Sequence, residues 1–239
     1  MKLDILAFGA HPDDVELGCG GSIALSIKQG KKVGIIDLTE GELGTRGNKK
    51  IRLKEAQKAS SVLGVLYRHN LKFRDGFFIN DEKHQLSIIS LLRDLRPEIV
   101  LCNAISDRHI DHSRASKLVS DSCFLSGLSK IQSKSKNGDD QIFWRPPKIY
   151  HYIQWDDLTP DFVINISKTI DVKIEAILKY KSQFYNPESK ENSTPISSKN
   201  FIDSVKYRAF NLGRLVGVEA GEGFTVERYL AVNSFDNLI

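Results

Sequence analysis

Cysteine, methionine and tryptophan are scarce in this sequence of 239 residues, which contains three, one and two of them. The three cysteines are far apart and form no CxxC pair, which excludes a disulfide scaffold and is typical of free thiols in a reducing cytosol. No apolar run reaches the ~18 residues that a membrane span needs, and the N-terminal run is too short for a signal peptide. We therefore expect a soluble, cytoplasmic protein that does not interact with membranes.

A strong excess of charge of one sign is also missing. The chain has 34 basic and 30 acidic residues, a formal net charge of +4, and only Lys130, Lys134 and Lys136 gather in one polar stretch. Because nucleic-acid binders concentrate basic residues on one face, we expect no nucleic-acid partner. The apolar and charged fractions, 41% and 27%, are those of an ordinary globular protein. The length fits one large domain, which we take to span residues 1–239.

Apolar runs alternate with helical patterns along the chain. We expect strands at 3–9, 33–38, 66–73, 98–102, 148–154, 162–166 and 225–232, and helices at 22–30, 51–64, 82–95, 112–125, 169–184 and 201–216. This order predicts an α/β fold, a Rossmann-like and mostly parallel sheet flanked by helices, with a modified C-terminal portion. Between these elements we expect a loop at 10–18, a mobile insertion at 126–140 that alters access to the site, and a surface loop at 188–199.

Two polar clusters follow expected strands directly. The first is HPDD at residues 11–14, and the second is DRHIDH at residues 107–112. Ligands of open α/β sheets bind beyond the carboxyl ends of the strands. If the first and fourth strands are neighbours, the two clusters therefore face each other across one crevice.

The residue types in the clusters suit metal-assisted hydrolysis. Catalytic zinc takes three ligands from His, Asp or Glu, keeps a position open for water and lowers the pKa of that water to about 7. His11, Asp14 and His112 supply two imidazoles and one carboxylate. The groups that remain for proton transfer, oxyanion stabilisation and orientation of an imidazole are Asp13, His109 and Asp111. Together these residues form a complete set for hydrolysis of an amide.

Simpler interpretations exist for each part. Asp13 and Asp14 could cap a helix around Ser22, and GCGG at 18–21 has some likeness to a dinucleotide turn, although it is not GxGxxG. A His/Asp metal site could also serve another bond, such as a phosphoester, for which two metals are common. A non-enzymatic Rossmann-type binding protein would hold no metal. Two clusters at two strand ends favour the metal-dependent enzyme. The other histidines, which have no acidic companions at ligand spacing, are interpreted as surface or core residues: His69, His84 and His151.

The same residues carry a family resemblance that runs over most of the chain. AHPDDVE at 10–16 resembles the signature of the PIG-L/LmbE-like zinc N-deacetylases, and HIDH at 109–112 resembles that family's second motif. Three further segments resemble the BshB1-type deacetylases of bacillithiol biosynthesis: GELGTRG at 41–47, RPPKIYHY at 145–152 and EGFTVER at 222–228.

The resemblance assigns roles by position. It implies one Zn²⁺ per chain, held by His11, Asp14 and His112, although Fe²⁺ can share such ligands. It further implies that Asp13 is the general base, and that His109, oriented by the carboxylate of Asp111, stabilises the oxyanion or acts as an acid. It also implies a homo-oligomer, a trimer or a hexamer.

The substrate that the resemblance implies is an N-acetylglucosaminyl compound, above all N-acetylglucosaminyl malate; a different N-acetylglucosamine conjugate is the alternative. Arg52 and Asp75 match positions that hold the sugar. Because a guanidinium pairs well with a carboxylate, Arg46, Arg52 and Arg108 are candidates for the malyl end. Two more residues are candidate substrate ligands, a loop carboxylate that can bind sugar hydroxyls and a tyrosine that follows the helix expected at 169–184: Glu42 and Tyr185.

Overall fold

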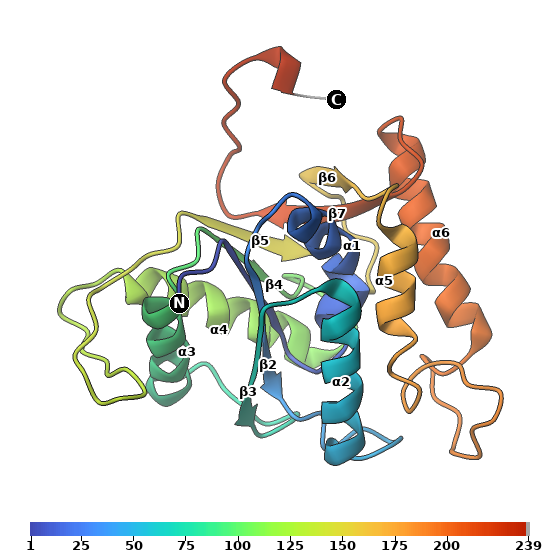
Figure 1. The fold of residues 1–239 in the computed structure, drawn as a ribbon, viewed down its shortest axis with the longest axis horizontal. Coiled ribbons are helices and arrows are strands. Elements are labelled where there is room, and N and C mark those ends of the chain that lie inside the picture. Colours follow the sequence, from blue (N-terminus) through green and yellow to red (C-terminus); the bar gives the residue numbers. More distant parts are fainter. Residues whose placement is uncertain (238–239) are drawn as a thin grey trace.

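Seven strands form a single sheet in the computed structural model, which describes residues 1–237 (Figure 1). They are β1 (Ile5–Gly9), β2 (Val33–Thr39), β3 (Tyr67–Phe73), β4 (Ile99–Cys102), β5 (Lys148–Tyr152), β6 (Phe162–Asn165) and β7 (Gly221–Val226). The strand order is β3-β2-β1-β4-β5-β7-β6. The first five strands pair in parallel, whereas β7 runs antiparallel to both β5 and β6. The antiparallel strands are the modified C-terminal portion that the sequence predicted.

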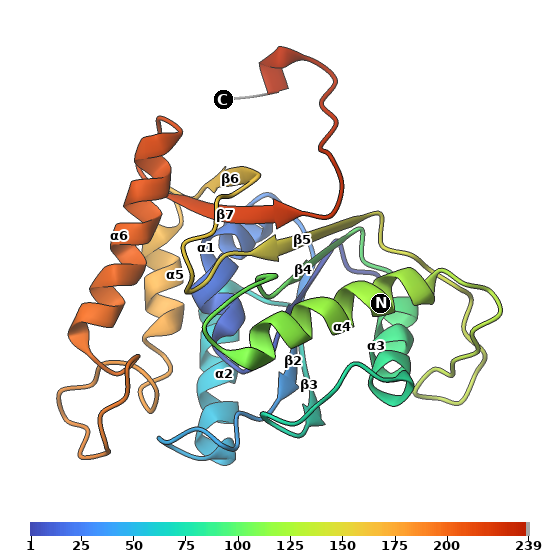
Figure 2. The same cartoon turned by 180° about the vertical axis from the view of Figure 1, so that it is seen from behind.

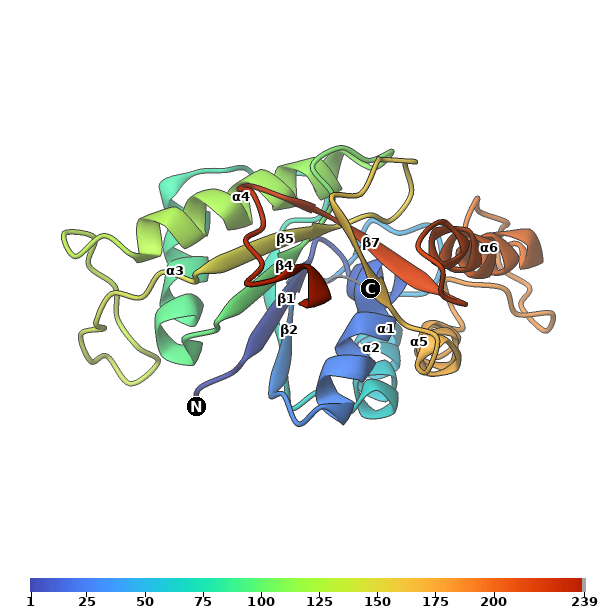
Figure 3. The ribbon, with the colours of Figure 1, turned by 90° about the horizontal axis from the view of Figure 1, so that it is seen from above.

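Helices cover both faces of this sheet. They are α1 (Asp14–Lys28), α2 (Lys49–Leu63), α3 (Glu82–Leu95), α4 (Ile110–Ser126), α5 (Ile170–Ile177) and α6 (Lys199–Leu215), and a 3-10 turn, η1, follows at Phe235–Asn237. Figure 3 shows α3 and α4 on one face and α1, α2 and α5 on the other, with α6 beyond them. Each layer seals its own apolar core against the sheet. No helix in the described part of the chain is long and apolar enough to cross a membrane.

The predicted α/β fold is confirmed. The two strands that precede the polar clusters, β1 and β4, are neighbours in the sheet. β1 pairs in parallel with β4, Ile5 opposite Ile99. The chain leaves β1 toward β2 and β3 on one side, and β4 and β5 lie on the other, so the topological switch point falls between β1 and β4. Ligands of such sheets bind at this point. Both polar clusters begin there.

The first helix starts earlier than the sequence predicted. Residues 14–18, expected in a loop, already belong to α1, which breaks its helical geometry at Cys19 (φ −141°, ψ 20°) and then continues. A Cβ on Gly18 would lie 2.1 Å from the ring of Tyr152, and one on Gly21 would lie 2.8 Å from Ile166. The glycines that have some likeness to a dinucleotide turn therefore allow close packing against the sheet.

Two C-terminal elements also differ from their predictions. The helix expected over 169–184 ends at Ile177, and the final strand is 221–226 instead of 225–232. Gly221 and Gly223 lie inside β7. A Cβ at Gly221 would lie 2.4 Å from a methyl group of Val163 on β6, so glycine is what lets these two strands approach.

The segment 126–140, which we expected to be mobile, is tied to α3 by one buried arginine. The guanidinium of Arg93 donates to three backbone carbonyls and one hydroxyl, those of Ser126, Leu128, Ile131 and Ser133. The segment lies at the far end of the molecule from α5 and α6 (Figure 2). None of its residues lines the cavity described below, so the prediction that it alters access to the site is wrong.

Candidate active site

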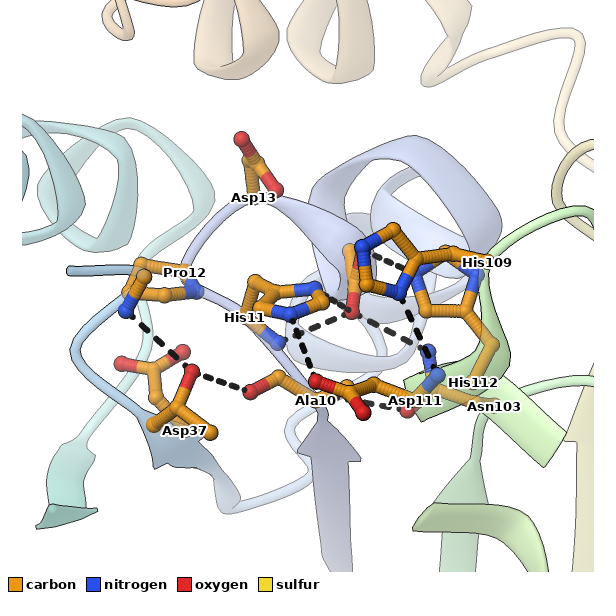
Figure 4. A network of polar contacts seen from close by, with 12 residues as sticks. Ala10, His11, Pro12, Asp13, Asp37, Asn103, His109, Asp111 and His112 are labelled. Atoms are coloured by element: carbon orange, nitrogen blue, oxygen red, sulfur yellow. Dashed lines mark hydrogen bonds and ion pairs between the residues drawn. The ribbon is translucent and has the colours of Figure 1, made fainter. Parts of the chain in front are cut away.

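The loops after β1 and β4 bring three imidazoles together. The ring centroids of His11 and His112 are 5.7 Å apart, and the ring of His109 lies 4.7 Å from that of His11 (Figure 4). One nitrogen from each of the three lies within 4.8 Å of the other two. The two clusters, which are far apart in sequence, thus form one site, as the sequence predicted.

Asp14 connects the two predicted histidine ligands. Its Oδ2 is 3.5 Å from Nδ1 of His11, and its Oδ1 is 3.2 Å from Nε2 of His112. The carboxylate is held by Asn103, whose Nδ2 donates over 3.1 Å, and by Gln154, whose Nε2 donates over 2.9 Å. Sequence reasoning missed both amides, although the position of Asn103 directly after β4 was a signal that could have found it.

A carboxylate lies behind each of the two ligand imidazoles. Oδ2 of Asp107 is 3.3 Å from Nδ1 of His112, on the ring side opposite Asp14. Oδ1 of Asp75 and Oδ2 of Asp111 lie 3.0 and 3.4 Å from Nε2 of His11. Carboxylates in this position fix the ring and the tautomer of metal-binding histidines. The ring nitrogens that face Asp14, Nδ1 of His11 and Nε2 of His112, are the ones left to bind a metal ion.

The electrostatics of this cluster favour a cation. Burial alone would lower the pKa of His11, but the carboxylates of Asp111, Asp14 and Asp75 raise it well above its usual range. Burial also opposes the charged form of His112, yet Asp14 and Asp107 raise its pKa to about 9. Buried carboxylates and imidazoles that together stabilise positive charge are the donor set of a divalent metal. The residues present therefore fit the predicted metal.

A second group meets the same distance condition, formed by His11, Asp75 and Asp111. Its carboxylates already accept backbone N–H groups, from Leu43 in the case of Asp75 and from Gly76 in the case of Asp111. These bonds suit carboxylates that orient a ligand more than carboxylates that are ligands themselves. These two carboxylates are therefore better placed to orient His11 than to bind the ion themselves.

Asp13 lies apart from the imidazoles, as Figure 4 shows. Its backbone has φ 121° and ψ −23°, a region that residues other than glycine rarely adopt and that costs about 1–3 kcal/mol. Burial raises the pKa of its carboxyl to about 7, although the ion pair with Arg52 opposes this shift. A carboxylate with a pKa near neutrality, at the wall of the cavity, suits a general base.

His109 is oriented differently from the prediction. The carboxylate of Asp111 binds Arg114 and Gly76 and faces His11, so its predicted contact with the His109 ring is wrong. Instead the backbone N–H of Asp111 donates to Nδ1 of His109 over 3.2 Å, because His109 caps α4. An accepting Nδ1 leaves the proton on Nε2. His109 is therefore a neutral hydrogen-bond donor at the cavity.

A cavity of about 720 Å³ opens over these residues. Four of the predicted substrate residues line it: Arg46, Arg52, Asp75 and Arg108. Glu42 and Tyr185 do not, and for them the prediction of a substrate contact is corrected. The carboxylate of Glu42 accepts the backbone N–H of Asp75, and Tyr185 lies outside the cavity wall. The C-terminal portion reaches the cavity through α6 instead.

The arginines of the cavity differ in what they already bind. Arg46 pairs with Glu191, and Arg52 pairs with Asp13. The guanidinium of Arg108 lies 4.3 Å above the ring of Trp155, and no carboxylate in the described part of the chain is within ion-pair distance of it. Arg208, which sequence reasoning missed, also lines the cavity and donates to the carbonyl of Trp155.

Two glutamates of the segment EGFTVER, at 222–228, hold the elements around the site in place. The carboxylate of Glu222 accepts the backbone N–H groups of Gly21 and Ser22, which the break at Cys19 leaves free, and also binds Lys173. The other glutamate of this segment, Glu227, is 3.0 Å from Nε2 of His151. His151 therefore has an acidic partner after all, 76 residues away, which sequence spacing could not reveal.

Comparison with known proteins identifies the family. The model of the PIG-L family, described as GlcNAc-PI de-N-acetylase, matches residues 6–123, which contain every residue of both clusters. The structure of the conserved protein TT1542 from Thermus thermophilus superposes with a TM-score of 0.85 and 34% identity, covering 97% of this chain and 98% of that one. The chain belongs to the PIG-L family.

Two relatives of this PIG-L chain are named for different reactions, a deacetylation and a hydration. It is 29% identical to the diacetylchitobiose deacetylase of Thermococcus kodakarensis, over 75% of this chain and 70% of the relative. It is 26% identical to the 4-oxalmesaconate hydratase of Pseudomonas putida, over 72% and 70%. The family match and the deacetylase relative confirm the predicted enzyme class, an N-deacetylase that hydrolyses an amide C–N bond.

Proposed function

We propose that this protein is a cytoplasmic, metal-dependent deacetylase of N-acetylglucosaminyl malate in bacillithiol biosynthesis, and that it works as a trimer or a hexamer. The observation that carries the reaction type is the convergence of His11, Asp14 and His112, each imidazole with a carboxylate behind it. Their donor set suits Zn²⁺, and Fe²⁺ shares it.

His11, Asp14 and His112 would hold the metal, with Asp107 and Asp75 fixing the two rings. When bound, a divalent cation supplies a Lewis acid that polarises the amide carbonyl and makes water more acidic. Asn103 and Gln154 keep the Asp14 carboxylate in place from the protein side. Proton transfer and stabilisation of the developing negative charge are carried out by side chains at the cavity wall.

Two of these side chains move protons or stabilise charge. Asp13, with a pKa near 7, takes the proton from the attacking water. Nε2–H of His109 donates to the oxygen that becomes negative in the tetrahedral intermediate. The protonated Asp13 carboxyl then gives this proton to the departing amine, while neutral His109 keeps its proton. Acetate and the free glucosaminyl compound are the products.

Support for malate as the aglycone comes from charge and space. A cavity of about 720 Å³ suits a ligand larger than one sugar. Arg108 and Arg208 both line it and both contact Trp155, and neither forms an ion pair within the described residues. Two guanidiniums without carboxylate partners fit an aglycone with two carboxylates.

The test is a panel of N-acetylglucosaminides with malyl or neutral aglycones, assayed for free amine after the metal is stripped and Zn²⁺ or Fe²⁺ is restored. We expect the malyl compound to give the highest kcat/KM, and Arg108→Gln to raise KM for it alone. Arg145→Gln is the matched control, because Arg145 also stacks on an aromatic ring, that of Phe124, away from the cavity. Equal kcat/KM for neutral aglycones would overturn malate, and no amine from any compound would overturn the function.

The hydratase relative supplies the second candidate reaction, because a fold alone does not select a chemistry. Both reactions activate water. Incubation with 4-oxalmesaconate distinguishes them, since hydration removes the absorbance of the double bond and releases no acetate. We expect no change in that absorbance.

A further inference from the structure

Trp155 contacts both arginines that the proposed function assigns to the aglycone carboxylates. The guanidinium carbon of Arg108 lies 4.3 Å from the centre of the Trp155 ring, and Nη2 of Arg208 donates to the backbone carbonyl of Trp155. All three residues line the cavity. Trp155 follows β5, which pairs in parallel with β4, so it lies at the same edge of the sheet as the candidate metal site.

Stacked rings anchor the indole of Trp155 in the protein core. Its ring centroid is 5.5 Å from that of Phe201, with 21° between the ring planes, and the ring of Phe201 lies 5.8 Å from that of Phe184 at 7°. Phe184 is 1% exposed. Because aromatic rings at such distances attract each other and core side chains are closely packed, the indole is held in place. Arg108 therefore packs against a rigid surface.

The backbone of Trp155 also reaches the metal site. Its N–H donates to Oδ2 of Asp107 over 3.2 Å, and the same oxygen lies 3.3 Å from Nδ1 of His112. One residue thus contacts a carboxylate behind a proposed metal ligand and both arginines that have no ion-pair partner. The protein therefore sets the position of these arginines relative to the metal site before a substrate binds.

Contact with the indole leaves Arg108 able to bind a ligand. This arginine is exposed, and its guanidinium forms no hydrogen bond or ion pair with another residue in the described part of the chain. A guanidinium has five N–H donors, and contact with one aromatic ring leaves an N–H edge free for a carboxylate. An exposed arginine otherwise loses rotamer freedom when it binds a ligand, which weakens the binding. The indole makes part of this loss unnecessary.

We propose that Trp155 is a positioning residue whose indole holds the Arg108 guanidinium ready for an aglycone carboxylate, and so determines a preference for anionic over neutral aglycones. The proposal rests on the proposed function, in which Arg108 binds the malyl end. The hydrogen bonds of Trp155 to Arg208 and Asp107 use backbone atoms. Replacement of its side chain therefore removes the contact with Arg108 and keeps these two bonds.

The first test uses Trp155 as the probe and needs no turnover. The chain has two tryptophans, and the other, Trp144, lies outside the cavity, where its Nε1 donates to the carbonyl of Pro97. In Trp144→Phe protein loaded with Zn²⁺, the product glucosaminyl malate should change the fluorescence of Trp155, and methyl glucosaminide should not. Adding Arg108→Gln should weaken the malyl response on the order of 10-fold or more. A malyl response that the methyl compound matches, or that Arg108→Gln leaves unchanged, would overturn the proposal.

The second test asks whether Trp155 acts through Arg108. The measured value is the selectivity, the ratio of kcat/KM for the malyl substrate to that for the methyl substrate. Trp155→Leu should lower it about 5- to 10-fold, mainly through a higher KM for the malyl compound, and Trp155→Phe, which keeps an aromatic face, should retain most of it. In the Arg108→Gln background, Trp155→Leu should cause no further loss. Losses that multiply in the double variant would refute action through Arg108.

Trp144→Leu is the matched control. The ring of Trp144 also lies near cations, 5.6 Å from Nζ of Lys2 and 6.0 Å from the guanidinium carbon of Arg96, but these residues do not line the cavity. This variant should leave the selectivity unchanged. A loss as large as that of Trp155→Leu would show that the effect does not depend on the contact with Arg108, and would refute the proposal.

The proposed function and the role of Trp155 fail separately. If the wild-type protein releases no amine from any N-acetylglucosaminide, the proposed function falls, while the fluorescence of Trp155 still decides whether a malyl compound binds beside it through Arg108. If the malyl compound is preferred but Trp155→Leu keeps the full selectivity, the function stands and the positioning role is refuted.

Discussion

Single residues in this site act mainly through other residues. Asp107, Asp75 and Asp111 contact imidazoles, and Arg52 contacts Asp13. In a buried cluster, the position and charge of each group depend on what lies behind it, because water is not there to compensate. The residues behind the ligands are therefore where substitutions should be most informative.

Replacing Asp107 by Asn should weaken metal binding about 10- to 100-fold, because the carboxylate that faces Nδ1 of His112 is lost while the three proposed ligands remain. Competition with a chromophoric chelator measures the affinity. Asp139→Asn removes an exposed carboxylate from the segment 126–140 and should leave the affinity unchanged. An Asp107→Asn affinity equal to that of the wild type would remove Asp107 from the site.

The pair of His151 and Glu227 should make stability depend on pH. Burial opposes charge on His151, but Cys102 and Glu227 raise its pKa to about 11; burial opposes charge on Glu227, but His151 lowers its pKa. The raised pKa of histidine stabilises the fold fully below about 6.5, and this contribution is lost as pH rises toward 11. The lowered pKa of glutamate stabilises it above about 4.5, and this contribution is lost at lower pH.

It follows that Glu227→Gln should reduce Tm most between about pH 4.5 and 6.5 and less at pH 9–10. Thermal unfolding of both proteins across this range measures the difference. A Tm difference that grows toward alkaline pH would contradict an imidazolium–carboxylate pair. Glu219→Gln, which changes a glutamate for which no ion pair is found in the described chain, should give a small difference at every pH.

Among the secondary-structure elements, α1 depends on several tertiary contacts for its position. It begins with Asp14, breaks at Cys19, and receives the carboxylate of Glu222 at the N–H groups freed by the break. Its glycines let it lie directly on Tyr152 and Ile166. The element therefore places a predicted metal ligand only if its two halves are held close to the sheet.

Gly18→Ala should destabilise the protein by about 3 kcal/mol or more, because the new Cβ would lie 2.1 Å from the ring of Tyr152. Gly20→Ala is the matched control in the same helix. Its Cβ would meet nothing nearer than 3.5 Å, and alanine is the better helix former, so stability should stay level or rise by up to about 1 kcal/mol. Urea denaturation measures both, and equal effects would contradict the packing role of Gly18.

For the whole molecule, the decisive feature is the switch point between β1 and β4. It directs two separate loops to one edge of the sheet, over a cavity that α6 helps to line. Figures 1 and 3 show how the N-terminal sheet supplies this edge while the C-terminal helices lie beside it. A metal at this point would cross-link the two halves of the parallel sheet.

Removal of the metal with a chelator should therefore abolish amine release and also lower Tm. Metal present at 100 times its dissociation constant stabilises the folded state by about 2.7 kcal/mol, which corresponds to a shift of ~5–10 °C here. Adding one equivalent of Zn²⁺ or Fe²⁺ per chain should restore both properties. A requirement for two equivalents would point to a two-metal hydrolase instead.

The sequence alone determined the order of the elements, the two clusters and the family, because apolar periodicity and short motifs are local properties of a chain. It also placed His11, Asp14 and His112 in one site, since parallel strands end at the same edge of a sheet. Only the tertiary structure decided which partner each side chain has. Arg52 meets Asp13 across 39 residues, and Glu227 meets His151 across 76. Such contacts depend on which loops and strands become neighbours, and short motifs do not contain this information. For the same reason only the structure shows that Arg52 contacts Asp13, that Asp75 contacts His11, and that the Asp111 carboxylate faces His11 instead of His109.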